Sequence, residues 1–187
     1  MPTISVIIST YNQSEWLRKT LLGYECQTFN SFEIIIADDG SDNRTKSVIN
    51  QFQTQSTLSI QHIWHEDQGF QKTKILNKAI VASKTDYLIF TDGDCIPRND
   101  FVEVHHKKRR CNSFLSGGYF KLPKTISELI SDDDIKSQTC FDSKWLLKHG
   151  LKRSFKLNKL SSKGAKEAFL NRFTFTKPSW NGMNSSG

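Results

Sequence analysis

The sequence predicts an α/β fold in which helices cover both faces of a mostly parallel sheet. Residues 4–9 and 33–37 are short, rich in isoleucine and almost continuously apolar, which is typical of parallel strands buried on both faces. A segment with helical spacing of its apolar residues separates the two. Strands and helices continue to alternate to about residue 95, and this alternation favours a doubly wound sheet joined by right-handed crossovers.

The first helix follows the first strand. Ser14 can cap this helix, whose apolar residues recur at roughly helical spacing: Trp16, Leu17, Leu21, Leu22 and Tyr24. By the same criteria we expect, in chain order, a helix over 44–52, a strand over 60–64, a helix over 72–82, a strand over 87–90, a helix over 101–110 and a strand over 114–122.

The pattern loosens beyond residue 122. Residues 124–177 are polar, show no strand periodicity, and have helical character at 126–130, 144–149 and 163–171. We expect this segment to be poorly packed or variable in conformation. The predicted organisation is a single domain, with a core over residues 1–122 and a helical segment over residues 123–187.

The positive charge lies near the C-terminus. The net charge is +7, yet the residues from Lys144 onward contain ten Lys or Arg and one acid, Glu167. Such a segment can meet phosphate ligands, nucleic acid or an anionic membrane surface, or can be a solvated helix face. Closely interleaved aromatic residues and a nucleic-acid motif are lacking, so we expect no nucleic-acid partner and retain peripheral membrane contact as an expectation.

Other features of the sequence point to a cytoplasmic protein. No apolar run approaches the ~20 residues needed to cross a bilayer, and the N-terminus reads as a core strand instead of a secretory signal. Four widely separated cysteines contain no Cys-x-x-Cys pair, which argues against a zinc site or a disulfide framework and favours reduced, mostly buried thiols.

Each predicted parallel strand ends in a polar loop. The loops cover residues 9–12, 38–42, 66–70 and 91–94, and ligands of open parallel sheets bind past the carboxyl ends of the strands. We therefore expect one site at this edge. Tyr11 can offer its ring to a base or can simply pack, and Asp38 and Asp39 can accept from an imide or a ribose hydroxyl or can form turns.

Two carboxylates flank a glycine at the end of the fourth strand. Asp92 and Asp94 point the same way if the segment is extended, and Gly93 lets another group approach closely. Two carboxylates together with phosphate oxygens form the usual ligand shell of Mg²⁺ or Mn²⁺. An isolated Asp-x-Asp is common in solvated turns, but its position after an apolar strand favours a metal site.

The ordered motifs resemble those of the family 2 glycosyltransferases, which have the Rossmann-like GT-A fold with a mixed sheet. The resemblance covers about residues 3–122, resumes near Trp180, and rests on Val-Ile-Ile-Ser-Thr-Tyr-Asn (residues 6–12), Gln27-Thr28-Phe29, Asp38-Asp39-Gly40-Ser41, Gln68-Gly69-Phe70, Asn77 and Asp92-Gly93-Asp94-Cys95-Ile96-Pro97.

The resemblance implies an inverting hexosyltransferase of polysaccharide biosynthesis. It would move a hexose or N-acetylhexosamine from a nucleoside diphosphate sugar, with uridine as the base, to a glycan or lipid-linked acceptor. Asp92 and Asp94 would hold Mn²⁺ or Mg²⁺. The implied nucleotide-sugar contacts are Thr10, Tyr11, Asn12, Asp38, Asp39, Gly69, Lys74, Asn77, Asp92, Gly93 and Asn184.

The sequence departs from the family pattern in two ways. Gln71 and Leu76 stand where relatives often have Arg, so Lys72 and Lys74 would have to supply the charge. The segment 181–186 resembles the Gly-x-Asn-x-Ser segment beside the donor sugar, but the acidic motif that follows it in relatives, with the general base, is not found before Gly187. The resemblance therefore assigns no catalytic base.

Neither the remaining acids nor the histidines supply an obvious base. We expect the acidic cluster of residues 132–134 to lie in a solvated loop, and His105 and His106 to have structural or surface roles. The alternative to an active transferase is thus a domain that binds the donor but is catalytically silent, either a truncated product or one module of a larger transferase.

Overall fold

The computed structural model describes residues 2–154, 157, 180 and 182–187. The chain forms two compact units, the first made of Met1–Gly117 with Trp180–Gly187 and the second of Gly118–Ser179. Among the helices within the described residues, none is long and apolar enough to cross a membrane.

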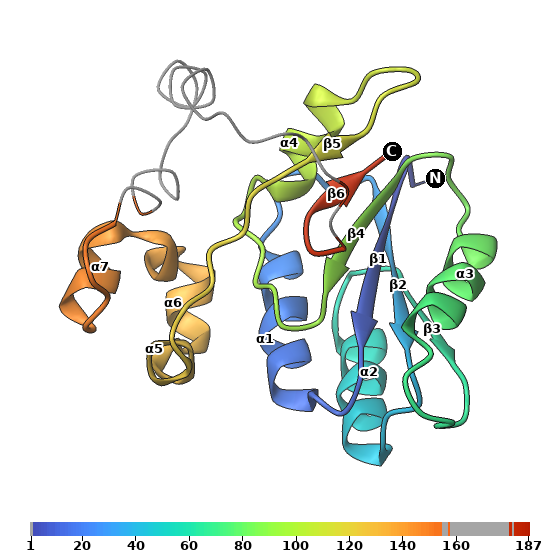
Figure 1. The fold of residues 1–187 in the computed structure, drawn as a ribbon, viewed down its shortest axis with the longest axis horizontal. Helices are drawn as coiled ribbons and strands as arrows, with labels where there is room; N and C mark the ends of the chain where they lie inside the picture. The colour runs from blue at the N-terminus through green and yellow to red at the C-terminus, as the bar shows by residue number, and fades with distance from the viewer. Residues whose placement is uncertain (1, 155–156, 158–179, 181) are drawn as a thin grey trace. The chain divides into compact units, whose positions relative to one another are not determined.

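The first unit is built on a six-stranded sheet with the strand order β3-β2-β1-β4-β6-β5 (Figure 1). Neighbouring strands from β3 to β4 run parallel, whereas β6 is antiparallel to both β4 and β5. The strands are β1 (Ile4–Thr10), β2 (Phe32–Asp38), β3 (Ile60–Trp64), β4 (Leu88–Asp92), β5 (Leu115–Ser116) and β6 (Ser185–Ser186). The predicted α/β fold with a mixed, Rossmann-like sheet is confirmed.

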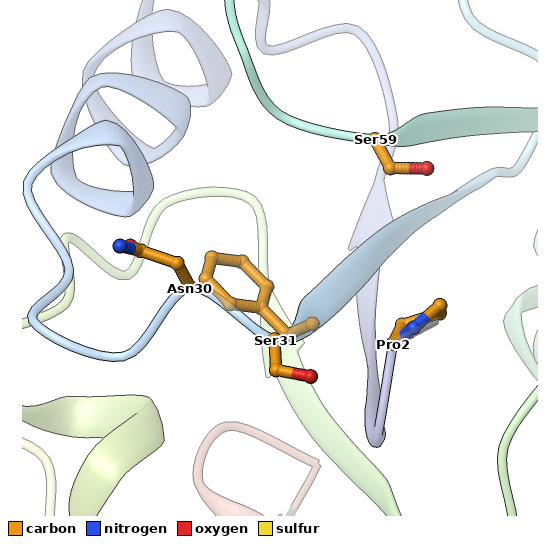
Figure 2. A pocket seen from close by; sticks show the side chains of 5 residues that line it. Pro2, Asn30, Ser31 and Ser59 are labelled. Atoms are coloured by element: carbon orange, nitrogen blue, oxygen red, sulfur yellow. The ribbon is translucent and has the colours of Figure 1, made fainter.

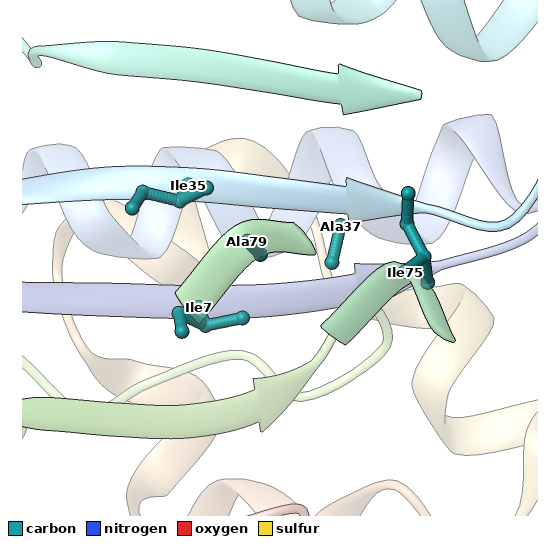
Figure 3. Close-up of a cluster of buried hydrophobic side chains, with 5 residues drawn as sticks. All are labelled: Ile7, Ile35, Ala37, Ile75 and Ala79. Atoms are coloured by element: carbon teal, nitrogen blue, oxygen red, sulfur yellow. The ribbon is translucent and has the colours of Figure 1, made fainter. Parts of the chain in front are cut away.

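The centre of the sheet is buried on both faces. All seven residues of β1 and all seven of β2 are buried, which explains why both strands read as continuous apolar runs. On one face, the helix α3 (Lys72–Ala82) packs Ile75 and Ala79 against Ile7, Ile35 and Ala37, as Figure 3 shows. Successive side chains of a strand point to opposite faces, so the neighbours of these strand residues face the other helices.

The other helices of the first unit are α1 (Ser14–Glu25), α2 (Asn43–Gln55) and α4 (Phe101–Lys108). Ser14 is the first helical residue of α1 and not its cap: Gln13 occupies the cap position and makes no side-chain capping bond. In α2, by contrast, Asp42 caps the helix by accepting from the backbone N–H groups of Arg44 and Thr45. The helix predicted over 44–52 therefore starts one residue earlier and continues to Gln55.

The strand predicted over 114–122 is wrong in extent, because only Leu115–Ser116 pair with the sheet. Its neighbour β6 comes from the far end of the sequence and lies between β5 and β4. Gly117 lies so close to the side-chain amide of Asn184 that a β-carbon would overlap it. Two-residue strands contain too few positions for a periodic signal, and the sequence therefore gave no indication of β6.

The second unit is a small helical body. It contains α5 (Lys124–Leu129), α6 (Asp132–Lys136), the 3₁₀ turn η1 (Thr139–Phe141) and α7 (Ser143–Lys148). Ile126, Leu146 and Leu157 form its core, so the expectation of poor packing is wrong for its described part. The helix expected over 163–171 lies outside the described residues.

The acidic cluster of residues 132–134 begins a helix, where a solvated loop was expected. Ser131 accepts a hydrogen bond from the backbone N–H of Asp134, and the Asp134 carboxylate accepts one from the backbone N–H of Ser131. This reciprocal capping arrangement satisfies two donors at the helix start. The hydrogen bond from the Ser131 hydroxyl also lowers the pKa of Asp134.

A buried carboxylate joins the amino-terminal halves of three strands. Glu33 Oε1 accepts from Ser5 Oγ at 2.7 Å and from the backbone N–H of Lys84 at 2.9 Å, and Oε2 accepts from Gln61 Nε2 at 3.0 Å. Burial of a charged group is costly unless hydrogen bonds replace its hydration. The three donors therefore make Glu33 a fixed point of the sheet.

We expect Glu33→Ala to lower the free energy of unfolding by about 2–4 kcal/mol, because one buried donor and two partly buried donors would lose their acceptor. Glu33→Gln should lower the free energy of unfolding by less, because the Gln61 amide can rotate so that its oxygen accepts from the new side-chain NH₂ group. Urea denaturation measures both variants. Glu25→Ala, at an exposed position on α1, is the matched control and should change the free energy by less than about 0.5 kcal/mol. Equal stability of Glu33→Ala and Glu25→Ala would contradict this role.

Candidate functional site

Strands β1, β2 and β4 end at the same level of the sheet. The register places Thr10 opposite Asp38 and Ser9 opposite Asp92, and the arrowheads of these strands point to the same edge of the sheet in Figure 1. The polar loops that follow the strands therefore gather at one edge, as the sequence predicts.

Asp92 is held at the end of β4 by two donors. Its Oδ1 accepts from Ser9 Oγ at 2.5 Å and from Lys72 Nζ at 2.6 Å. The side chains of Lys72 and Asp92 are 33% and 24% exposed, so the ion pair remains accessible to solvent. Of the two lysines expected to supply charge, Lys72 is the one that contacts Asp92.

Gly93 and Asp94 form the turn after Asp92. The backbone N–H of Gly93 donates to Ser9 O at 2.7 Å, and a β-carbon on Gly93 would lie 3.1 Å from Ser9 O and from Thr10 Oγ1. The close approach of the two strands here favours glycine. Asp94 is exposed to solvent. The next residue, Cys95, has its pKa raised to about 12, first by burial and then by the charges of Asp94 and Asp92, so its thiol stays protonated.

Asp38 stabilises the turn that follows β2. It is fully buried, and its Oδ1 accepts from the backbone N–H of Ser41 at 2.8 Å. Its Oδ2 lies 2.9 Å from His62 Nε2. Both carboxylate oxygens thus have protein partners, and the geometry gives Asp38 a structural part in shaping the loop.

Asp39 links the same loop to the start of α3. Its Oδ1 lies 2.7 Å from His65 Nε2, and its Oδ2 accepts from the backbone N–H of Gln71 at 2.9 Å. Gln71 precedes the first residue of α3. The position of Lys72 therefore depends on Asp39 as well as on the helix itself.

Tyr11 reaches across to the loop after β3. Its hydroxyl donates to Asp67 Oδ2 at 2.8 Å, and its side chain is about half exposed. The hydrogen bond to the Asp67 carboxylate raises the pKa of Tyr11, and the same bond is the main cause of the lowered pKa of Asp67. The phenol is thereby fixed, while part of the ring remains open to a ligand.

Asn12 and Gly40 hold the first two loops together. The side-chain oxygen of Asn12 accepts from the backbone N–H of Asp42 at 2.8 Å, and the backbone N–H of Asn12 donates to Ser41 Oγ at 2.9 Å. Gly40 has φ of +94°, and a β-carbon there would lie 2.6 Å from Asp67 Cα. Only glycine fits this contact between the loops after β2 and β3.

The remaining predicted nucleotide contacts lie in different surroundings. Lys74 and Asn77 are exposed on α3, where they line a hollow of about 420 Å³ together with Lys78 and Val81. Gly69 has φ of +83°, and a β-carbon there would have no neighbour within 4 Å. The Thr10 hydroxyl is buried and has no hydrogen-bond partner among the described residues.

Asn184 is engaged in a buried polar cluster. Its Oδ1 lies 2.9 Å from His105 Nε2, and His105 Nδ1 lies 2.6 Å from Ser186 Oγ. Burial lowers the pKa of His105, which is therefore neutral at neutral pH. The structure thus uses His105 to fasten the segment of residues 184–186 to α4.

The two carboxylates of the Asp-x-Asp motif suit a hard divalent cation. Asp94 is exposed, and Asp92 Oδ2 has no hydrogen-bond partner within the described residues. In that part of the chain, no group of three or more His, Cys, Asp or Glu side chains is placed to hold a metal ion. Gly93 and Asp94 lie in a turn, so the extended segment considered for Asp92–Asp94 is not present. Two carboxylates still have the chemistry that a hard cation needs, and its other ligands would come from a bound phosphate or from water.

Several residues that shape this edge were not named as contacts from the sequence, although Ser9 and Asp67 lie in the predicted polar loops. Ser9, His62, His65 and Asp67 all bond to predicted site residues. A partial signal existed for His62, because it is a polar residue within β3, which pairs with β2 and ends with Trp64 opposite Asp38. His65 and Asp67 lie in an irregular loop, for which periodicity gives no information.

A hollow of about 480 Å³ lies at the opposite edge of the sheet, among residues that precede strands β1, β2 and β3 (Figure 2). It is lined by Pro2, Asn30, Ser31, Phe32 and Ser59. None of these side chains is titratable at ordinary pH. The hollow therefore offers less chemistry than the carboxyl-end loops.

Comparison with known proteins finds glycosyltransferases among the sequence relatives of this chain. The chain is 34% identical over 105 residues to the glycosyltransferase AglE of Haloferax volcanii, which covers 55% of this chain and 34% of that protein. It is 32% identical over 103 residues to a chondroitin synthase of Escherichia coli, and this match covers 54% of this chain and 15% of that protein. Among solved structures, the chain aligns with the mannosyltransferase PcManGT of Pyrobaculum calidifontis in complex with GDP-Man and Mn²⁺. The TM-score is 0.48 at 24% identity, and the alignment covers 54% of this chain and 30% of that chain.

The matched part of the chain spans at most about a third of the length of these curated relatives. The family model described as "Glycosyl transferase family 2" matches residues 5–108, which include β1 to β4 and their loops. That match covers more than half of the 187 residues, and the chain therefore belongs to the family 2 glycosyltransferases.

Proposed function

We propose that the carboxyl-end loops bind a nucleoside diphosphate sugar, with uridine as the nucleoside, and that the chain serves an inverting transfer of a hexose or N-acetylhexosamine. The acceptor is a glycan or a lipid-linked glycan. The single observation that carries the proposal is the alignment of Thr10, Asp38 and Asp92 at one edge of the sheet in a family 2 glycosyltransferase.

The base of the nucleotide would lie beside Tyr11. The ring is about half exposed, and its hydroxyl is fixed by Asp67, so it can present a stable face for stacking. The nearby Asp39 carboxylate already accepts from Gln71 and contacts His65. A carboxylate has about four acceptor sites, which leaves capacity for the imide N–H of uracil. Asn12 and Asp38 would act by holding these loops in place.

The diphosphate would lie at the end of β4. Asp92 and Asp94 would hold Mn²⁺ or Mg²⁺ together with phosphate oxygens, and Gly93 keeps the turn close to β1. When bound, the cation would compensate the charge of the departing diphosphate. Lys72 contacts Asp92 and can also reach a phosphate, and Gly69, Lys74, Asn77 and Asn184 would line the donor more distantly.

The acceptor side is assigned to residues beyond the core. The second unit and the basic residues from Lys144 onward would meet the acceptor or an anionic membrane surface, and we propose a cytoplasmic site of action. A large single-sign charge favours contact with anionic surfaces. The division into a donor-binding part over residues 1–122 and an acceptor-side part over residues 123–187 belongs to the same proposal. Within the second range, however, Asn184 and β6 belong to the first unit, and we assign them to the donor-binding part.

We expect the double variant Asp92→Asn with Asp94→Asn to lose Mn²⁺-dependent binding of uridine diphosphate, because two neutral amides hold a hard cation poorly. Isothermal titration calorimetry with Mn²⁺, and with chelator in its place, measures the effect. Asp86→Asn, an exposed change before β4, is the matched control. If the double variant and its parent bound uridine diphosphate with equal Mn²⁺-dependent affinity, the metal assignment would be wrong.

The stacking role of Tyr11 can be separated from its hydrogen bond. Stacking of a base on an aromatic ring contributes about 1–3 kcal/mol, so Tyr11→Ala should weaken uridine diphosphate binding by about 5- to 150-fold. Tyr11→Phe keeps the ring and should remain within about threefold of the parent. If both variants lost the same affinity, the hydroxyl and not the ring would carry the contact. A parallel titration with guanosine diphosphate tests the choice of uridine.

The proposal assigns no general base among the described residues. Asp134 accepts the capping bonds of α6, and its pKa is lowered by the Ser131 hydroxyl, so it is a weak base. General-base assistance typically contributes ~10²–10⁴-fold. We therefore expect the 187-residue chain alone to bind the donor but to transfer sugar far below ordinary rates of ~1–10³ s⁻¹. An assay with radiolabelled donor sugar measures the transfer rate. Transfer at an ordinary rate would contradict this expectation and show that the chain contains a base, and Asp132 and Asp133 would then be the first residues to substitute.

A further inference from the structure

The ion pair between Lys72 and Asp92 connects the first residue of α3 to the last residue of β4. Asp92 Oδ1 accepts from Lys72 Nζ at 2.6 Å and from Ser9 Oγ at 2.5 Å, whereas Oδ2 has no hydrogen-bond partner in the described part of the chain. About a third of the Lys72 side chain and a quarter of the Asp92 side chain are exposed. The pair is thus formed, yet open to a ligand.

This ion pair changes the charge that an incoming cation meets. Asp92 and Asp94 together carry two negative charges, and the Lys72 ammonium cancels one of them at hydrogen-bond distance from a proposed metal ligand. A bare divalent cation is repelled by that ammonium. A divalent cation chelated by the diphosphate of a nucleotide sugar has no net charge, and its phosphate oxygens attract the ammonium.

The local structure lets the ammonium move while the helix stays fixed. Asp39 Oδ2 accepts from the backbone N–H of Gln71 and so anchors the start of α3. Ser9 is buried and keeps its own bond to Asp92 Oδ1, so Asp92 remains oriented when Lys72 departs. The four-carbon stem of lysine and its rotatable donors allow Nζ to turn from the carboxylate to a phosphate oxygen.

We propose that Lys72 is a built-in counter-ion that makes metal binding depend on the diphosphate. Lys72 pairs with Asp92 when the site is free of ligand, and it transfers to the diphosphate oxygens when metal and nucleotide bind together. The inference rests on the proposed function, because it requires the metal and the diphosphate to share the Asp92 site. It assigns to Lys72 a positioning and specificity role that the paired aspartates alone do not have.

The proposal makes two predictions of opposite sign for one substitution. In Lys72→Met, Mn²⁺ alone should bind about tenfold more tightly, because both carboxylates are then uncompensated. Uridine diphosphate in the presence of saturating Mn²⁺ should bind about tenfold more weakly, because the phosphate loses its ammonium partner. A residue that merely stabilised the fold would weaken both binding events.

The experiment measures free Mn²⁺ by electron paramagnetic resonance without nucleotide, and uridine diphosphate binding by calorimetry with Mn²⁺. Lys72→Arg retains the charge and should stay near the parent in both. Lys84→Met removes one positive charge at an exposed position before β4, at the opposite end of that strand from Asp92, and should change neither measurement. Circular dichroism and thermal unfolding check that each variant is folded.

The outcomes separate this inference from the proposed function. Opposite changes in Lys72→Met, with Lys72→Arg and Lys84→Met near the parent, support it. Unchanged binding in Lys72→Met, or changes of the same sign, overturn it, while the double aspartate variant still reports on the metal site. If that double variant binds Mn²⁺ and uridine diphosphate as the parent does, the proposed metal site fails and the inference fails with it.

Discussion

Pairing of β1 with β2 on one side and β4 on the other places Ser9 opposite Asp92 and Thr10 opposite Asp38. This register follows from burial: every residue of β1 and β2 is buried, and a shift by one residue would turn each side chain to the other face. The loops at the carboxyl edge therefore start from fixed and level points. The bonds from Ser9 to Asp92 and from Gly93 to Ser9 exist only in this register, and the position of Lys72 relative to Asp92 depends on it too.

The acidic loop after β2 organises the carboxyl-end edge of the sheet. Asp38 is buried and contacts His62 and the Ser41 N–H, and Asp39 contacts His65 and the Gln71 N–H. Buried carboxylates are tolerated only when hydrogen bonds replace water. These bonds set the turn after β2 and the start of α3 in advance. A ligand that arrives at this edge therefore meets loops whose shape is already determined, which reduces the ordering cost of binding.

The parts of the fold with strong periodicity could be predicted from the sequence, and the irregular parts could not. The strand over 60–64 and the helix over 72–82 were predicted with the bounds that the structure shows, because both have several apolar positions and clear ends. The two-residue strands β5 and β6 left no such pattern. Within the candidate site, the strand-end positions of Asp38, Asp39 and Asp92 were predictable, but their partners were not. His65 reaches Asp39 from the loop after β3, and Lys72 reaches Asp92 from α3. Such contacts depend on tertiary structure.

The place of β6 in the sheet affects when the first unit can be completed. Residues 185–186 insert between β4 and β5, and Ser186 bonds to Tyr87 and His105, about 80–100 residues earlier in the chain. Closing so long a loop costs entropy before any contact repays it. During synthesis, the four parallel strands can pair as soon as residue 92 has emerged, but β5 has no neighbour in the sheet until residue 186 does. The order of chain emergence therefore leaves one side of β4 without its neighbouring strand until residue 186 has emerged.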